Sequence, residues 1–127
     1  MRSLPAFVGV ELKKDEIFDY IVSCGIRHPR IVYAQVIEET GNFTSWLYKN
    51  NKNLFGMKFA TIRKTTAVGT MKGHAVYNSY KDSILDYKLW QECSPLLDGE
   101  DYFGYLLRRS YAGNENYIMN LKKILGS

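Results

Sequence analysis

Residues 54–80 read LFGMKFATIRKTTAVGTMKGHAVYNSY, and this stretch decides the fold class because its composition differs from that of its surroundings. Threonine, valine and glycine become frequent here, and Lys72-Gly73 is suited to the tight turn of a hairpin. The flanking segments instead space their apolar residues three or four positions apart, as amphipathic helices do. We therefore predict an α+β fold, a mainly helical domain with a small β lobe inserted at about residues 54–80.

Helical patterns account for most of the chain outside this lobe. Residues 13–24 place apolar side chains at helical spacing, and Gly25 is typical of the position just after a helix. Residues 30–40 repeat the pattern and end at Gly41-Asn42. Further helices are predicted at residues 45–49, 99–109 and 115–125.

The helix that follows the β lobe has a recognisable start. Ser79 and Asp82 resemble a capping box, in which side chains satisfy the free amides of the first helical turn. Leu85, Leu89 and Cys93 then recur at steps of four and predict an apolar side for this helix. The proline that comes next ends it.

The totals are those of one soluble domain. The chain has 127 residues, 46% of them hydrophobic and 24% charged, and we expect a single domain over residues 1–127 that is a monomer. No apolar run approaches the ~20 residues of a membrane-spanning helix, so membrane insertion is not expected. The start, Met1-Arg2-Ser3-Leu4-Pro5, lacks the apolar segment of a signal peptide.

Positive charge is concentrated in one part of the chain. The formal net charge is +4, and residues 42–81 contain no aspartate or glutamate. This segment is either a solvated basic surface or a wall that faces a negatively charged partner. No nucleic-acid-binding motif is present, so nucleic acid is a poor candidate for that partner. The basic residues of the segment are Lys49, Lys52, Lys58, Arg63, Lys64, Lys72 and Lys81.

The sequence predicts neither a metal site nor a cofactor. Cys24 and Cys93 lie far apart without metal-ligand spacing, and helical patterns around them favour buried free thiols, although one disulfide remains an alternative. His28 and His74 have no suitably spaced carboxylates, so both are interpreted as surface or turn residues. No phosphate-binding loop, nucleophilic serine elbow or zinc motif is found.

Four short segments carry the chemical information. They are Ala34-Gln35-Val36-Ile37-Glu38-Glu39-Thr40-Gly41, then Asn53-Leu54-Phe55-Gly56-Met57-Lys58, then Val76-Tyr77-Asn78-Ser79-Tyr80 with Ser83-Ile84-Leu85-Asp86-Tyr87, and finally Tyr111-Ala112-Gly113-Asn114-Glu115-Asn116-Tyr117. In this order they resemble the signature segments of bacterial N-acetylglucosaminidases, glycoside hydrolase family 73. The resemblance spans residues 34–117 and covers most of the chain.

The resemblance implies a lysozyme-like α+β fold and hydrolysis of the β-1,4 bond that follows N-acetylglucosamine in peptidoglycan. It makes peptidoglycan glycan strands the partner, implies an extracytoplasmic location, and places the general acid at Glu39. Aromatic residues inside the matching segments are candidates for a glycan groove, because sugars present flat apolar faces. Gln35 and Asn53 either bind substrate through hydrogen bonds or hold the backbone between the lobes. The substrate-binding candidates are Gln35, Asn53, Phe55, Tyr80, Tyr111 and Tyr117.

Elementary physical chemistry agrees with Glu39 as an acid. Glycoside cleavage needs a carboxylic acid that is still protonated near neutral pH, whereas a free glutamate titrates near ~4.3. A glutamate at a helix end beside an apolar stripe loses solvation, which raises its pKa, and the negative end of the helix dipole acts in the same direction. Nearby lysines oppose the rise. Glu38 is the competitor, because periodicity alone does not separate the two glutamates.

The second catalytic group is not evident. Standard glycosidase routes use a base or nucleophile opposite the acid, and the acid-free segment 42–81 offers none. Three accounts stay open. The substrate's N-acetyl group assists, Asp86 reaches the groove rather than anchoring the β lobe, or the protein binds glycan and cuts it poorly.

Alternative functions follow from this gap. A non-catalytic peptidoglycan-binding relative, and a lytic transglycosylase that works with a single glutamate, both remain compatible with the sequence. Trp46 and Trp90 are interpreted as core residues rather than sugar platforms.

Overall fold

The computed structural model describes residues 11–111 and 115–126. The expectation for Met1–Pro5 and the middle of the fourth segment, residues 112–114, therefore lie outside the described residues. Over the described part the chain is mainly helical with a two-stranded antiparallel sheet, which confirms the predicted α+β class. The elements are α2 (Lys14–Ser23), α3 (Pro29–Glu39), the π-helical turn η1 (Leu47–Asn51), β1 (Gly69–Met71), β2 (His74–Val76), α4 (Tyr80–Cys93), α5 (Tyr102–Arg108) and α6 (Glu115–Leu125).

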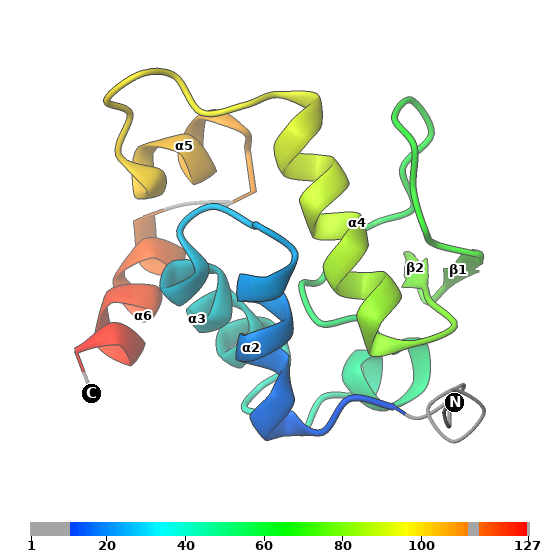
Figure 1. The fold of residues 1–127 in the computed structure, drawn as a ribbon. Coiled ribbons are helices and arrows are strands. Elements are labelled where there is room, and N and C mark those ends of the chain that lie inside the picture. The colour runs from blue at the N-terminus through cyan, green and yellow to red at the C-terminus, as the bar shows by residue number, and fades with distance from the viewer. Residues whose placement is uncertain (1–10, 112–114, 127) are drawn as a thin grey trace, which may run out of the picture.

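Helix α4 divides the molecule into two parts. In Figure 1 the helices α2, α3, α5 and α6 lie on one side of α4, and the β1–β2 hairpin lies on the other. Helix α3 packs against both α2 and α6, so it runs through the helical part. Its last residue, Glu39, lies against Gly56, where the chain enters the β lobe.

The hairpin forms at the predicted turn. β1 pairs antiparallel with β2, and Lys72 and Gly73 connect them with φ values of 54° and 76°. Two successive positive φ angles match the right-handed twist of the strands that they join. The sheet is smaller than the predicted lobe, since the described residues 54–68 contain no strand.

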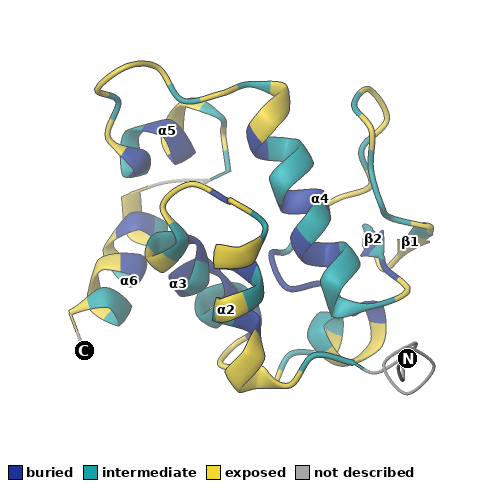
Figure 2. Cartoon of the chain, in the orientation of Figure 1, coloured by how far each residue is buried: buried dark blue, intermediate teal, exposed yellow. Residues whose placement is uncertain are grey.

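The core is aromatic around Tyr87, which is fully buried on α4. Its ring lies 4.5 Å from that of Phe55 and 5.2 Å from that of Trp90, measured between centroids. Figure 2 shows the buried residues on the facing sides of α3, α4 and α6 and on the chain entering the β lobe. Within the described residues, no helix is both long and apolar enough to cross a membrane.

The prediction of which side of α4 is buried is wrong. Leu85 and Leu89 are only half-buried and Cys93 is exposed, whereas Ile84, Tyr87 and Gln91 face the core. A search for apolar residues does not find this buried side, because Tyr87 and Gln91 carry polar atoms. Both residues make their hydrogen bonds inside the protein. The start of the helix agrees with the prediction, since the Ser79 hydroxyl accepts a hydrogen bond from the Asp82 amide.

Two further expectations need correction. Trp46 is 42% exposed and carries the Lys72 ammonium 4.6 Å above its ring, so it lies on the surface rather than in the core. The short helix predicted at 45–49 is the π-helical turn η1, which begins at Leu47. Both cysteines are free thiols, as expected, but neither is buried, since Cys24 is half-buried and Cys93 is exposed.

Candidate functional site

The carboxyl group of Glu39 lies against the backbone that opens the β lobe. Helix α3 ends at Glu39 because Gly41 and Asn42 both adopt φ of 56°, the left-handed conformation common at helix ends. A Cβ atom placed on Gly56 would lie only 2.4 Å from Oε1 of Glu39. Gly56 itself has φ of 68°, so both its conformation and its contact with Glu39 require a glycine.

The surroundings of Glu39 favour its neutral form. Burial raises the pKa of Glu39 above the ordinary glutamate value, and a hydrogen bond from Tyr117 works against that rise. The charge of Glu38 raises this pKa further, while His74 lowers it. Desolvation is the largest of these effects, and a carboxyl group with such a pKa keeps its proton closer to neutral pH.

The two adjacent glutamates have different partners. Glu38 accepts a hydrogen bond of 2.9 Å from Nδ2 of Asn120 on α6, whereas Glu39 contacts Gly56. Periodicity does not make this distinction, but the structure makes it directly. Glu39 is the glutamate that faces the junction between the helical part and the β lobe.

A buried chain of hydrogen bonds ends at Glu39. Gln35 donates through Nε2 to the Tyr117 hydroxyl over 3.2 Å and accepts from the Tyr87 hydroxyl over 2.5 Å. Tyr87 in turn contacts the Tyr102 hydroxyl, which accepts from Nε2 of Gln91. Because Tyr117 donates to Glu39, the chain fixes that carboxyl from the core side.

Most of the other predicted substrate-binding residues are engaged in the interior. Asn53 is buried and donates to the carbonyl oxygens of Met57 and Ala75, which joins the start of the lobe to β2. The ring of Phe55 is 1% exposed and lies in the core. Gln35 and Asn53 therefore make their hydrogen bonds within the protein.

Tyr111 lies near the acid, and Tyr80 is placed elsewhere. The hydroxyl of Tyr111 donates to the carbonyl oxygen of Phe55, and the charge of Glu39 contributes to the rise in the pKa of Tyr111. Tyr80 stacks on Tyr48 at 4.9 Å, and its hydroxyl donates to the Tyr48 carbonyl oxygen. The structure thus brings Tyr111 and Tyr117 to Glu39, and it ties Tyr80 to η1.

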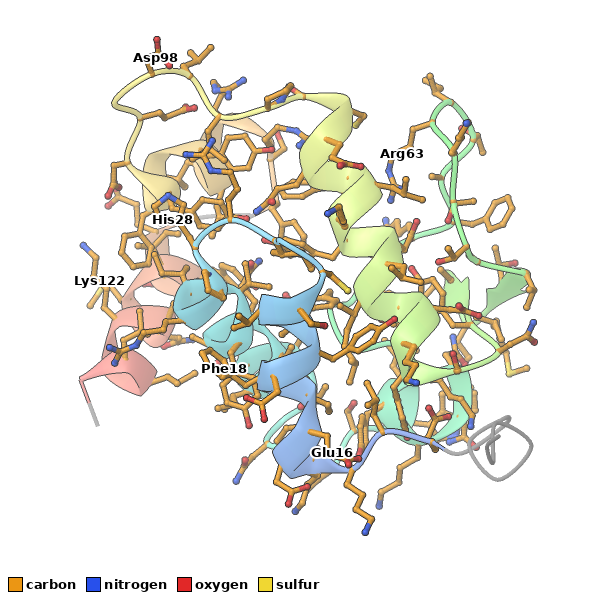
Figure 3. All side chains as sticks on the ribbon, in the orientation of Figure 1. Glu16, Phe18, His28, Arg63, Asp98 and Lys122 are labelled. Carbon is orange, nitrogen blue, oxygen red and sulfur yellow. The ribbon has the colours of Figure 1, made fainter. Side chains whose placement is uncertain are left out.

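Asp86 is fully buried and its oxygens are occupied. It pairs with Arg63 at 2.6 Å and accepts hydrogen bonds from Thr65 at 2.7 Å and from Tyr77 at 2.5 Å. Figure 3 shows Arg63 pointing from the loop of the β lobe toward α4. These contacts favour the anchoring role, since Asp86 joins α4 to three parts of the lobe.

His74 lies half-buried on β2, and its Nδ1 is 3.0 Å from the carbonyl oxygen of Lys72 in the hairpin turn. This contact is consistent with the turn role expected for it, and its charge lowers the pKa of Glu39. His28, in contrast, is an exposed residue with φ of 56° at the start of α3, as expected.

A pocket of about 370 Å³ opens beside this junction. No cluster of three or more histidine, cysteine, aspartate or glutamate residues able to hold a metal ion occurs in the described part of the chain. The pocket is lined by Gly56, Met57, Lys58, Trp90, Arg109, Ser110 and Tyr111.

Comparison with known proteins gives a consistent result. Residues 19–127 match the family model described as mannosyl-glycoprotein endo-beta-N-acetylglucosaminidase. A segment of 57 residues is 42% identical to Protein bax of Escherichia coli (strain K12) and covers 45% of this chain but 21% of that protein. The chain therefore matches only about a fifth of the length of that relative. No solved structure matches.

The contact between Glu39 and Gly56 predicts that substitutions at these two positions are coupled in their effects on stability. Gly73, a glycine without such a contact, is the matched control. Gly56→Ala and Gly73→Ala each place alanine in a left-handed conformation, at a cost of about 1–2 kcal/mol. Only the first also pushes the Glu39 carboxyl aside, because nothing lies within 4 Å of a Cβ on Gly73. Urea unfolding of double variants with Glu39→Ala should give a coupling of about 0.5–1 kcal/mol with position 56 and none with position 73. Equal coupling at the two positions would contradict the contact.

The contacts of Asp86 predict that its replacement lowers the stability of the protein. Asp86→Asn leaves the Arg63 charge without its partner and should cost about 3 kcal/mol of unfolding free energy. Thr65→Val, the milder comparison, removes the hydrogen bond donated to Asp86 and the one accepted from the Ala67 amide, and should cost about 1–2 kcal/mol. Both are measured by urea unfolding. If folded Asp86→Asn protein, assayed well below its melting temperature, lost at least about 100-fold in glycan cleavage, Asp86 would be a catalytic group instead.

Proposed function

The chain belongs to the glucosaminidase family whose model matches residues 19–127, and we propose that it hydrolyses peptidoglycan as an endo-β-N-acetylglucosaminidase. The bond cleaved is the β-1,4 bond that follows N-acetylglucosamine, and Glu39 is the general acid. The observation that carries this proposal is the position of Glu39, half-buried against Gly56 where the chain enters the β lobe, with a raised pKa. A protonated carboxyl group at that place can give its proton to the leaving glycosidic oxygen.

The groups around Glu39 suit the two halves of such a reaction. Desolvation keeps the acid neutral before the bond breaks, and the Tyr117 hydroxyl stabilises the carboxylate that remains after the proton has left. The surroundings of Glu39 therefore stabilise both its protonated and its ionised form, and a group that acts first as an acid and then as a base needs both forms.

We propose that the substrate supplies the second catalytic group. Among the described residues, which include every aspartate and glutamate of the chain, the carboxyl group that influences Glu39 is that of Glu38, and it is bound to Asn120. The acetamido carbonyl oxygen of the N-acetylglucosamine unit attacks C1 as the C1–O bond breaks and Glu39 protonates the departing oxygen. Water then attacks C1 and loses a proton to Glu39, while the bond between C1 and the acetamido oxygen breaks and the acetamide is restored. The sugar is released with retained configuration.

The remaining features of the proposal follow from the family and the layout. We propose that the arrangement is lysozyme-like, with the cleft between the helical part and the β lobe, that it forms one monomeric domain, and that it acts outside the cytoplasm on wall glycan. The pocket beside Gly56 and Tyr111 supports the position of the cleft.

Replacing the proposed acid should abolish cleavage. Glu39→Gln keeps the shape of the side chain but has no proton to give, so release of reducing ends from purified cell walls should fall about 100-fold to 10,000-fold. Glu38→Gln is the matched control, because it changes the adjacent carboxyl group that faces α6, and it should retain cleavage. Circular dichroism verifies that both variants are folded. Undiminished activity in Glu39→Gln would remove the proposal.

The same variant should be more stable than the wild type at neutral pH. Because the folded-state pKa of Glu39 is raised, ionising this group disfavours folding, and the penalty is fully present above the raised pKa. The penalty disappears below the ordinary glutamate pKa of about 4.3, where the group is protonated in both states. The melting temperature of Glu39→Gln should thus exceed that of the wild type at pH 7 and converge with it as the pH falls below 4. A difference that grew toward low pH would indicate the opposite shift.

A non-catalytic glycan-binding protein is the second candidate, favoured by the lack of a free second carboxylate near Glu39. It predicts binding to insoluble peptidoglycan without reducing-end release anywhere between pH 4 and 8. Mass spectrometry of the products also separates hydrolysis from a lytic transglycosylase, which leaves an anhydro sugar end. Hydrolysis should give ordinary reducing ends.

A further inference from the structure

Building on the proposed function, we propose that the pocket beside Gly56 is a subsite for a carboxylate carried by the glycan, held by Lys58 and Arg109. Peptidoglycan offers two sources of such a group. Where no peptide is attached, the lactyl side chain of the muramic acid unit ends in a free carboxylate, and where a peptide is attached, the peptide itself carries carboxylates. Neutral oligomers of N-acetylglucosamine have neither.

The position of the pocket places its occupant next to the reacting bond. Gly56 lines the pocket and is also the residue against which the Glu39 carboxyl group lies. Tyr111 also lines the pocket, and its hydroxyl donates to the carbonyl oxygen of Phe55, the residue directly before Gly56. A sugar unit in this pocket is therefore a neighbour of the sugar that Glu39 protonates.

The charge of the pocket is positive and uncompensated. Its lining contains Lys58 and Arg109 and has no aspartate or glutamate. The ion pairs found in residues 11–111 and 115–126 join Lys52 to Glu11, Arg63 to Asp86 and Arg108 to Glu100. Neither cation of the pocket has a carboxylate partner in this part of the chain, so an incoming carboxylate meets charge that the protein itself does not neutralise.

Arg109 is held in place by neutral groups. Its Nη1 donates to the Trp90 carbonyl oxygen at 2.7 Å and to the Tyr105 hydroxyl at 2.6 Å. The guanidinium carbon lies 3.9 Å from the centroid of the Trp90 ring. These contacts fix the side chain but leave its charge intact, so little conformational entropy is lost when an anion binds.

Lys58 supplies the adjustable half of the subsite. It is exposed, directly follows the buried Met57, and belongs to the acid-free segment 42–81. Of the two interpretations of that segment, a solvated surface or a wall toward an anion, the pocket favours the second at this one position. Lys64 of the same segment is also exposed and is not part of the pocket lining, which makes it a matched control.

The test compares three glycans in a Glu39→Gln background, where the ligand is not cut. Isothermal titration calorimetry measures binding of peptide-free glycan strands with lactyl carboxylates, of peptide-bearing strands, and of neutral N-acetylglucosamine oligomers. Lys58→Met should weaken binding of the carboxylate-bearing strands roughly threefold to tenfold and leave the neutral oligomers unchanged. Lys64→Met should change none of the three. If Lys58→Met weakens binding of the peptide-free strands, the subsite binds the lactyl carboxylate. If it weakens binding of the peptide-bearing strands alone, the subsite binds a carboxylate of the peptide.

If Lys58→Met weakened binding of all three glycans equally, or of none of them, the proposed subsite would be wrong. Arg109→Gln is the second variant, checked for folding by near-ultraviolet circular dichroism because Arg109 packs on Trp90. The result is separable from the reaction. If the wild type bound carboxylate-bearing strands in a Lys58-dependent way but never released reducing ends, the hydrolysis would be wrong and the subsite would stand. If it cut walls with a KM that Lys58→Met did not alter, the reaction would stand and the subsite would be wrong.

Discussion

The contact of one carboxyl group with one glycine backbone is the constraint on which the site depends. Glu39 ends α3, and its side chain occupies the space that any Cβ at position 56 would need. The chain enters the β lobe at Gly56 in a left-handed conformation, so the acid and the lobe are placed by the same residue. Water is kept from much of the carboxyl group in consequence, and desolvation is the largest cause of its raised pKa.

Two buried polar networks hold this contact from opposite sides. On the helical side, hydrogen bonds run from Gln91 through Tyr102, Tyr87 and Gln35 to Tyr117. On the lobe side, Asp86 of α4 binds the loop and the end of β2. Polar networks in a low-dielectric interior are costly unless every member is satisfied, and for that reason a satisfied network specifies one arrangement. Helix α4 contributes to both, which explains why its buried face is more polar than apolar spacing predicts.

Local sequence rules account for the elements but less well for the site. Glycines, a proline and helical spacing locate most helix ends, and Lys72-Gly73 locates the hairpin, because such signals act over a few residues. The side of α4 that is buried, the exposure of Trp46 and the contact of Glu39 with Gly56 depend on segments far apart in the chain. The resemblance of short segments to a family indicated Glu39, and only the three-dimensional structure distinguishes its environment from that of Glu38.

The central claim concerns the protonation state of a single group, and a carbon-13 NMR titration of the Glu39 carboxyl measures that state directly. The Glu39→Gln spectrum assigns the resonance. We expect its titration midpoint to lie above the value of about 4.3 found for a solvated glutamate, because burial favours the neutral form. A midpoint at or below that value would mean that the carboxyl group is ionised wherever the protein works, and that it has no proton to donate to a glycosidic oxygen.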